Sequence, residues 1–291
     1  MRMRYAVIVV TRNGASTLRS TLDSILGQTM KPSSVCVVND GSTDDTAKIL
    51  ATYHSRNRST FYIVNRPDRG YDIRRVPINL NCAHETLRVA NAEYEYYMIS
   101  GDDCVYPKEY AASLVSRMTS TPPVAVASGQ PRSYGSISQE HSPSGSGRML
   151  RSSFWNAIGG KYPPRAGWET WLLYKALEAG FRVRLYPDLI YEHLRPRGST
   201  HQFTYWGAAM YALGYHPLYA LGRIVKNLIN RRVTLRGSVN MLIGYIQACL
   251  GSSDPFMSAF ERPVRVFVHK QQGREIVSAV RSLSTILVKR Q

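Results

Sequence analysis

Two adjacent carboxylates, Asp102 and Asp103, are the most telling residues in the sequence for their types and spacing. They follow an apolar run in the segment YYMISGDDCVYP, Tyr96–Pro107. Adjacent carboxylates repel each other, and a hard cation such as Mg²⁺ or Mn²⁺ removes that cost because it prefers oxygen ligands. A metal held there would neutralise a diphosphate leaving group. The alternative is a solvated turn, which is how most Asp-Asp pairs behave.

A third carboxylate, Asp40, stands at the end of another apolar run, in VVNDGSTDDT, Val37–Thr46. It could accept hydrogen bonds from a nucleobase edge or a ribose. The alternative is a turn residue, since Asp-Gly favours tight turns. Asp44 and Asp45 are better explained as acids in the first turn of a helix, where the helix dipole favours them.

Glu169 is a candidate general base. It begins a helix after the loop Tyr162–Gly167 and stands beside Trp168 and Trp171. A carboxylate against aromatic surface can have a raised pKa, as a general base requires. The alternative is an ordinary acid in the first turn of a helix.

Other signatures of chemistry are missing. The sequence has no GxGxxG and no GxxxxGK[ST] motif, so dinucleotide and P-loop sites lack support. No Ser-His-Asp or Cys-His arrangement can be argued from spacing. The four cysteines do not form a CxxC pair, which favours a reducing compartment over a zinc site or a disulfide framework. They are Cys36, Cys82, Cys104 and Cys249.

These residues are positioned by an alternation of strands and helices. Four apolar runs of strand length are separated by helical patterns, and they are Tyr5–Val10, Val35–Val38, Phe61–Val64 and Tyr94–Ser100. Continuous apolar strands between helices predict an α/β fold with a parallel sheet covered on both faces. In such a sheet ligands bind at the carboxyl ends of the strands, where Asp40 and Asp102 stand.

Further along the chain, a Ser-, Gly- and Pro-rich loop is expected over Gln130–Gly147 and a helix over Glu169–Ala179. Strands are expected at Arg182–Tyr186 and Ile190–Leu194, and a final helix over Gly273–Leu287.

The last third of the chain is basic and aromatic. From Arg195 onward there are fourteen Lys and Arg against three acidic residues, which is +11 of a net charge of +17. The apolar stretches Phe203–Ile229 and Val239–Leu250 fall short of the ~20 uninterrupted apolar residues of a spanning helix. They suit interfacial helices on an anionic membrane surface. The alternatives are helices that pack on the rest of the protein or form a dimer interface. The positive charge also suggests a nucleic-acid-binding protein as an alternative. Against this, the charge is concentrated outside the α/β region, and no nucleic-acid-binding module is recognisable.

Four segments together resemble glycosyltransferase family 2, and the resemblance covers roughly residues 5–195. VVNDGSTDDT resembles the nucleotide-binding signature of the family and is the most specific match. The others are VIVVTRNGASTLRSTLDSILGQT at the first strand, ISGDDCVYP at the metal motif and NAIGGKYPPRAGWETWLLYKALEAG on the acceptor side. The resemblance implies a GT-A fold, which is a Rossmann-like nucleotide-diphospho-sugar transferase domain. It would occupy residues 1–199, and residues 200–291 would form a helical, membrane-associated extension.

The resemblance also implies roles for residues of the donor site. Asp40 would contact the base of a nucleoside diphosphate sugar, with the backbone near Thr11 and Asn13 lining the same pocket. Asp102 and Asp103 would serve the diphosphate and an Mn²⁺ or Mg²⁺ ion. Asp72 lies where the family contacts nucleotide and ribose, and an ion pair of Asp72 with Arg74 or Arg75 is the alternative.

On the acceptor side, Glu169 takes the place of the family's base, at the family's spacing from Leu172 and Lys175. His193 is a further candidate metal ligand, with a structural role as its alternative. Arg195 and Arg197 could bind the diphosphate. Two departures from the family pattern are Ser100, where an Asp is frequent, and Glu169 itself, where Asp is usual.

The implied activity is an inverting transfer of a hexose from a UDP- or GDP-linked donor to an acceptor hydroxyl. The basic extension predicts a lipid-linked or cell-envelope glycan as acceptor and a cytoplasmic location, peripheral on the inner face of the cell membrane. Three alternatives remain beside it. They are an inactive scaffold, a nucleic-acid-binding protein and a sugar-phosphate nucleotidyltransferase, although the last would need a Gly-rich basic loop after the first strand.

Overall fold

The computed structural model of the protein describes residues 3–90, 93–121, 123–132, 142–195, 202–230 and 233–288, with side chains up to residue 278. Contacts within the chain divide it into two compact units. The first consists of Met1–Pro163 and Ala179–Arg197, and the second of Pro164–Glu178 and Gly198–Gln291. The expected domain boundary after residue 199 differs from this division, because Pro164–Glu178 joins the C-terminal residues.

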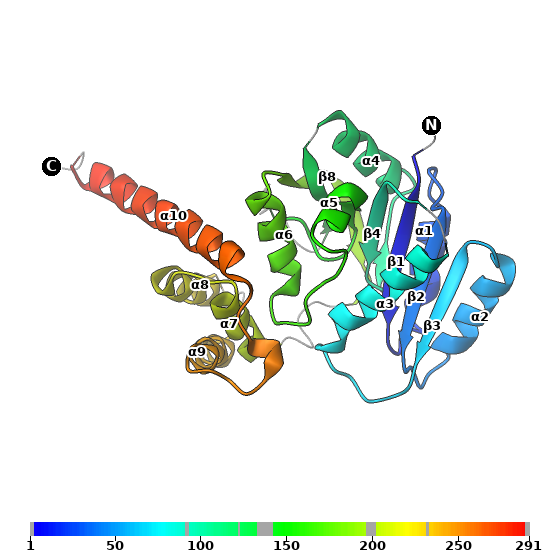
Figure 1. The fold of residues 1–291 in the computed structure, drawn as a ribbon, viewed down its shortest axis with the longest axis horizontal. Helices are drawn as coiled ribbons and strands as arrows, with labels where there is room; N and C mark the ends of the chain where they lie inside the picture. Colours follow the sequence, from blue (N-terminus) through cyan, green and yellow to red (C-terminus); the bar gives the residue numbers. More distant parts are fainter. Residues whose placement is uncertain are drawn as a thin grey trace. The chain divides into compact units, whose positions relative to one another are not determined.

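An eight-stranded sheet forms the centre of the first unit, in the order β3-β2-β1-β4-β7-β6-β8-β5 (Figure 1). Its strands are β1 Tyr5–Thr11, β2 Ser34–Asp40, β3 Phe61–Arg66, β4 Tyr96–Ser100, β5 Cys104–Val105, β6 Val124–Pro131, β7 Arg148–Arg151 and β8 Arg182–His193. The helices of this unit are α1 Leu18–Leu26, α2 Thr46–Arg56, α3 Arg75–Val89, α4 Tyr110–Ser120 and α5 Ser152–Ala157.

The parallel part of the sheet is as the sequence predicts. Strands β3, β2, β1 and β4 run parallel, with Val7 of β1 level with Val35 on one side and with Met98 on the other. Every residue of β2 is buried, since both faces of the sheet are covered.

Beyond β4 the sheet differs from the expectation. Neither β6 nor β7 is among the expected strands, and β7 enters antiparallel between β4 and β6. Arg182–Tyr186 and Ile190–Leu194 were expected as two strands, whereas one strand, β8, covers Arg182–His193. Within the expected loop Gln130–Gly147, residues 133–141 lie outside the described residues.

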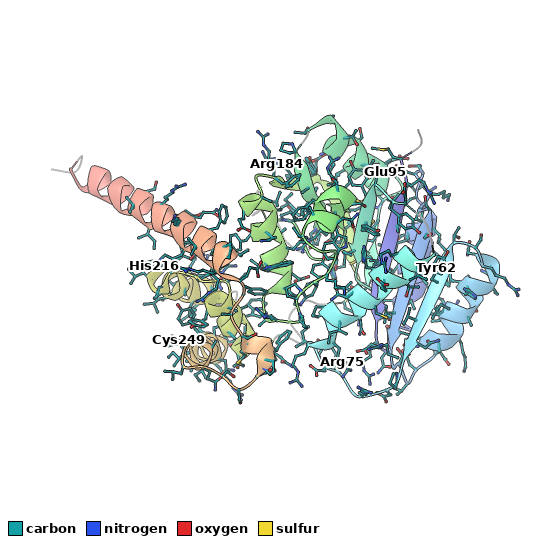
Figure 2. All side chains as sticks on the ribbon, in the orientation of Figure 1. Tyr62, Arg75, Glu95, Arg184, His216 and Cys249 are labelled. Atoms are coloured by element: carbon teal, nitrogen blue, oxygen red, sulfur yellow. The ribbon has the colours of Figure 1, made fainter. Side chains whose placement is uncertain are left out.

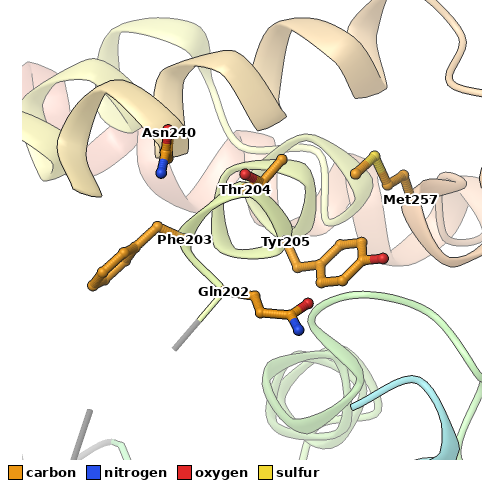
Figure 3. A pocket seen from close by; sticks show the side chains of 6 residues that line it. All are labelled: Gln202, Phe203, Thr204, Tyr205, Asn240 and Met257. Carbon is orange, nitrogen blue, oxygen red and sulfur yellow. The ribbon is translucent and has the colours of Figure 1, made fainter. Parts of the chain in front are cut away.

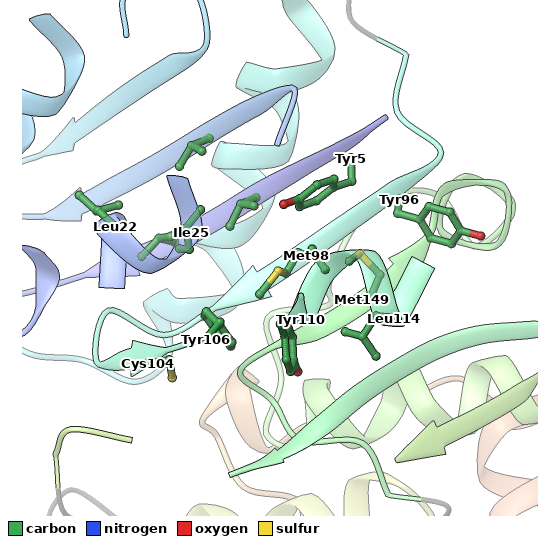
Figure 4. Close-up of a cluster of buried hydrophobic side chains, with 14 of the residues drawn as sticks. Tyr5, Leu22, Ile25, Tyr96, Met98, Cys104, Tyr106, Tyr110, Leu114 and Met149 are labelled. Atoms are coloured by element: carbon green, nitrogen blue, oxygen red, sulfur yellow. The ribbon is translucent and has the colours of Figure 1, made fainter. Parts of the chain in front are cut away.

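Helices cover the two faces because alternate side chains of each strand point to opposite sides. On one face Tyr5 and Met98 pack with Leu22 and Ile25 of α1 and with Leu114 of α4 (Figure 4). On the other face α3 contacts β1 and β2 and buries its own apolar residues. Those are Leu80, Ala83 and Leu87. The sheet is therefore a rigid support for the residues at its carboxyl edge.

The second unit is helical, with α6 Trp168–Glu178, α7 Phe203–Ala212, α8 Pro217–Ile229, α9 Leu235–Cys249, the short 3₁₀ helix η2 Pro255–Met257 and α10 Arg262–Val288. Helix α6 belongs here because Trp171 stacks on Phe260 and donates a 3.0 Å hydrogen bond from Nε1 to Glu261 Oε1. The final helix begins at Arg262 rather than at the expected Gly273. Among the described residues, no helix combines the length and the apolar character needed to cross a membrane.

Candidate active site

The carboxyl ends of β1 and β4 adjoin where the strand order reverses. The chain leaves β1 for β2 and β3 on one side, and β4 lies on the other side. Ligands of open α/β sheets bind at such a switch point. Thr11 ends β1 and its hydroxyl donates a 2.6 Å hydrogen bond to Oδ2 of the buried Asp102, just beyond β4. Two of the residues predicted from the sequence thus meet at the switch point.

Asn13 ties the turn after β1 to the turn after β2. Its backbone N–H donates to the Ser42 hydroxyl at 2.9 Å, and its Oδ1 accepts from the Thr43 amide at 2.8 Å. Its φ of 51° lies in the left-handed region, which Asn tolerates better than most residues. In this structure the Asn13 side chain therefore holds two loops of the carboxyl edge together.

Asp40, at the end of β2, is buried and paired with a guanidinium. Arg75 approaches it with Nε at 3.2 and 3.3 Å from the two carboxylate oxygens and with Nη2 at 3.2 Å from Oδ2. Arg75 is the first residue of α3 (Figure 2). From the sequence, Arg75 was expected only as a possible partner for Asp72, because its contact with Asp40 spans 35 residues.

Arg12 and Asp68 complete this corner of the edge. Arg12 Nη1 donates to the carbonyls of Asp40 at 2.7 Å and Gly41 at 2.5 Å, and its Nη2 pairs with Asp68 Oδ1 at 2.7 Å. A Cβ on Gly41 would stand 2.4 Å from the Asp68 Cα, so only glycine fits this turn. No local sequence signal marks Arg12 and Asp68, since the pair spans 56 residues.

Asp72 forms the ion pair that was the alternative to its nucleotide role. Its carboxylate lies 2.9 Å from Arg74 Nη2 and accepts a 2.9 Å hydrogen bond from the Arg74 amide. The hydrogen bond from the Arg74 guanidinium lowers the pKa of Asp72. The partner is thus Arg74, while Arg75 pairs with Asp40.

Asp103, Cys104 and His193 form a second cluster beyond β4. Strand β5 pairs antiparallel with the end of β8, and Cys104 stands opposite His193. The His193 Nδ1 lies 3.3 Å from Asp103 Oδ2, and the Cys104 sulfur lies 3.6 Å from His193 Nε2. One potential ligand atom from each residue lies within 4.8 Å of the others. Asp103 and His193 were predicted from the sequence, whereas Cys104 was not, because it belongs to no CxxC pair.

The three groups differ as ligands for a cation. Burial raises the pKa of the Cys104 thiol to about 12, so the sulfur stays protonated near neutral pH. The His193 Nδ1 is buried and has no hydrogen-bond partner among the described residues. A carboxylate and an open imidazole nitrogen suit a divalent cation, whereas a neutral thiol does not.

Arg195 places a positive charge against both carboxylates. It forms an ion pair with Asp102 through Nη2, and its Nε lies 3.4 Å from Asp103 Oδ2. Burial lowers the pKa of Arg195. Arg197, named with it from the sequence, lies outside the described residues.

Glu169 lies in the second unit, at the second position of α6. It is exposed, while Trp168 and Trp171 are buried with 9% and 5% exposure. The two flanking indoles are therefore buried, while Glu169 itself lies at the surface.

A pocket of about 370 Å³ lies in the second unit (Figure 3). It is lined by Gln202, Phe203, Thr204, Tyr205, Asn240 and Met257. Among the described residues that line it there is no ionisable carboxylate, so this pocket offers polar and aromatic contacts rather than acid–base chemistry.

Comparison with known proteins places these features in a family. A family model described as Glycosyl transferase family 2 matches residues 6–181. The uncharacterized glycosyltransferase YibD of Escherichia coli (strain K12) is 26% identical over 107 residues, which are 37% of this chain and 28% of that protein. The similarity thus extends over less than a third of YibD.

Two solved structures share the fold. S. aureus TarS 1–349 in complex with UDP-GlcNAc has a TM-score of 0.58 at 18% identity, covering 84% of this chain and 81% of that one. The mannosyltransferase PcManGT from Pyrobaculum calidifontis, in complex with GDP-Man and Mn²⁺, has a TM-score of 0.58 at 19% identity. That match covers 97% of this chain and 88% of PcManGT. At these identities the likeness concerns the fold.

Proposed function

The chain belongs to glycosyltransferase family 2, and from this premise we propose that it moves a hexose from a UDP- or GDP-linked donor to an acceptor hydroxyl with inversion at the anomeric carbon. It is a glycosyltransferase with the GT-A fold. The TarS and PcManGT structures contain UDP-GlcNAc and GDP-Man, and donors of this class are what we propose for this chain.

The observation that carries the proposal is the arrangement of charge at the carboxyl edge. Asp40 and Asp102, at the ends of β2 and β4, flank β1, and the guanidinium groups of Arg12, Arg75 and Arg195 lie against the same edge. Carboxylates suit ribose and base N–H or O–H groups, and guanidinium groups suit a diphosphate. One edge therefore offers complementary groups for both halves of a nucleoside diphosphate.

Within that edge we assign Asp40 to the base, Asp72 to the ribose and the backbone near Thr11 and Asn13 to the wall of the nucleotide pocket. Asp102 faces the diphosphate. Arg195 is paired with Asp102. When the donor binds, Arg195 would either leave Asp102 or contact both the carboxylate and the phosphates, since a guanidinium can bind both kinds of group.

We assign the divalent metal, Mn²⁺ or Mg²⁺, to Asp103 with Asp102 and His193. Asp103 and His193 fit, since Nδ1 of His193 lies 3.3 Å from an oxygen of Asp103, whereas Asp102 is paired with Thr11 and Arg195 in this structure. When bound, the metal supplies a Lewis acid that stabilises the charge of the leaving diphosphate. The Cys104 thiol takes no part as a ligand while it is protonated.

Glu169 is our candidate for the base that accepts the proton of the attacking hydroxyl. It is exposed at the second position of α6. The acceptor is proposed to be a lipid-linked or cell-envelope glycan, and the protein to work on the cytoplasmic side, peripheral on the membrane. Fourteen Lys and Arg against three acids from Arg195 onward support an anionic surface as partner.

The test is a binding and turnover screen of the full chain with UDP- and GDP-sugars, with Mn²⁺, Mg²⁺ or EDTA. We expect one donor to bind in a metal-dependent way. Asp40→Asn should weaken that binding at least about tenfold, while Asp45→Asn, which removes an exposed charge paired with Lys48, should not. Glu169→Gln should bind the donor and lose turnover, and the anomeric configuration of the product should be inverted.

A folded, metal-loaded protein that binds no nucleotide sugar would refute the proposal and favour the inactive scaffold. Turnover retained in Glu169→Gln would refute the assignment of the base alone.

A further inference from the structure

Helix α8 turns large aliphatic side chains toward solvent. Leu218, Leu221, Val225 and Ile229 are 64%, 51%, 45% and 73% exposed. Their spacing of three or four residues puts them on one stripe of the helix. The residues that α8 buries, Ala220 and Ile224, lie on the other side.

Helix α9 repeats this arrangement. Its exposed stripe consists of Leu235, Val239, Leu242, Ile243 and Ile246, with Leu250 just past its end, and these side chains are between 42% and 82% exposed. The spacing again follows helical turns. Soluble proteins rarely leave so many neighbouring aliphatic side chains uncovered, and such patches mark an interaction surface.

The inner face of α9 is lined mostly by small residues, which are Gly237, Ser238, Gly244 and Ala248, beside the larger Met241. A Cβ on Gly207 of α7 would stand 1.8 Å from the Met241 carbonyl oxygen, and one on Gly244 of α9 would stand 1.9 Å from the Thr204 carbonyl oxygen. The two helices therefore meet backbone to backbone through glycine. Small residues inside and large aliphatic residues outside reverse the pattern of a helix in water, and they are the pattern of helices that pack in lipid.

The charged residues of the segment that contains these stripes are all basic, and an acidic side chain from outside it, Glu275, interacts with Tyr219 of α8. Residues 198–253 contain no Asp or Glu, and their five Lys and Arg are Arg223, Lys226, Arg231, Arg232 and Arg236. Lys226 follows Val225 and lies one turn before Ile229, and Arg236 lies one turn before Val239. An aliphatic stripe bordered by cations is complementary to a bilayer with anionic headgroups.

A second copy of the chain fits this surface less well. A two-fold dimer sets the same patch of each copy against the other, which would bring Lys226 and Arg236 of each copy together, while residues 198–253 supply no acid to pair them. Helix α9 is too short to cross a bilayer. Its fifteen residues extend only about 22 Å, less than the ~30 Å of a hydrocarbon core. The helix can lie in the interface but not span it.

We propose that the exposed stripes of α8 and α9 dock the enzyme onto an anionic lipid bilayer, with the stripes entering the headgroup–acyl boundary. This docking proposal deepens the proposed function and rests on it, because docking would serve to bring the enzyme to an acceptor held in the membrane. The docking itself is a property of the helices and can be measured without any sugar.

The experiment is flotation of the full chain with vesicles of phosphatidylcholine alone or mixed with phosphatidylglycerol. We expect binding to the anionic vesicles. Val225→Ser with Ile229→Ser, or Ile243→Ser with Ile246→Ser, should weaken it at least about tenfold. The matched control removes two exposed aliphatic side chains from α3, with Ile78→Ser and Val89→Ser, and should bind as the parent protein does. Lys226→Gln with Arg236→Gln should weaken binding about 30-fold.

Three results would overturn the proposal. They are a parent protein that stays with neither vesicle, stripe variants that bind as tightly as the parent, and a parent that is dimeric by light scattering and becomes monomeric in the stripe variants without binding lipid. Donor binding measured without vesicles separates a failure of the docking proposal from a failure of the proposed function, because the stripe variants should bind nucleotide sugar as the parent does.

Discussion

The Thr11 hydroxyl donates a 2.6 Å hydrogen bond to Asp102 Oδ2, and this contact joins the carboxyl ends of β1 and β4. Gly14 lies against the same pair, where a Cβ would stand 2.4 Å from Thr11 Oγ1 and 2.6 Å from Asp102 Oδ2. The position of the Asp102 carboxylate is therefore set by the turn after β1 as much as by its own strand.

Thr11→Val should lower both stability and donor binding. It keeps the shape of the side chain and leaves a buried carboxylate oxygen without its donor, which costs about 1–3 kcal/mol in the free energy of unfolding. Urea denaturation and donor titration measure the two effects. Thr11→Ser retains the hydroxyl and is the control; equal losses in both variants would mean that the methyl group rather than the hydrogen bond matters.

Gly41→Ala should destabilise the protein more than Gly70→Ala. Both glycines have positive φ, 67° and 71°, so both substitutions carry backbone strain. Only at Gly41 does the new Cβ meet backbone, at 2.4 Å from the Asp68 Cα, whereas no described atom lies within 4 Å at Gly70. The difference between the two free energies of unfolding isolates the close approach of the loops, and identical values would argue against it.

Mn²⁺ binding should depend on Asp103 and His193 and not on Cys104. Asp103→Asn and His193→Phe each remove a proposed ligand, while Cys104→Ser exchanges a protonated thiol for a hydroxyl of similar size. The free Mn²⁺ signal in electron paramagnetic resonance reports binding without any turnover. We expect at least about tenfold weaker binding in the first two variants, and a comparable loss in Cys104→Ser would show that the sulfur is a ligand after all.

His84 should make the protein less stable in mild acid. Burial lowers its pKa from 6.5 to about 4, and its ring packs edge-on against Tyr97 and Trp155. The unfolded chain therefore takes up a proton as the pH falls below 6.5, while the folded protein does so only near 4. Stability is complete above pH 6.5 and declines through this window, by about 3 kcal/mol in total.

Denaturation of the parent protein and of His84→Phe at pH 7 and pH 4.5 measures this linkage. The loss between the two pH values should be smaller in the variant, even if the variant is less stable at both. A parallel loss in the two proteins would assign the acid sensitivity to other groups.

The sequence was sufficient for the parallel half of the sheet. Runs such as Val35–Val38 are continuous and apolar, and a strand covered on both faces needs that composition. Because parallel strands end at one edge, Asp40 and Asp102 could be placed there from their positions after such runs. Strand β7 could not be predicted in this way, since it has only four residues, Arg148–Arg151, and two of them are arginine. Strand β6 begins with the apolar run Val124–Ala127 and was nevertheless missed.

The sequence alone therefore predicts local features, which are the segments that form strands or helices and the carboxylates that follow the strands. The tertiary structure decided the partners. Asp40 meets Arg75, Asp102 meets Thr11 and Arg195, and Cys104 stands opposite His193 across 89 residues. Helical and strand periods reach only a few residues along the chain, so pairings between distant segments come from strand order and register, which arise only when the whole core packs.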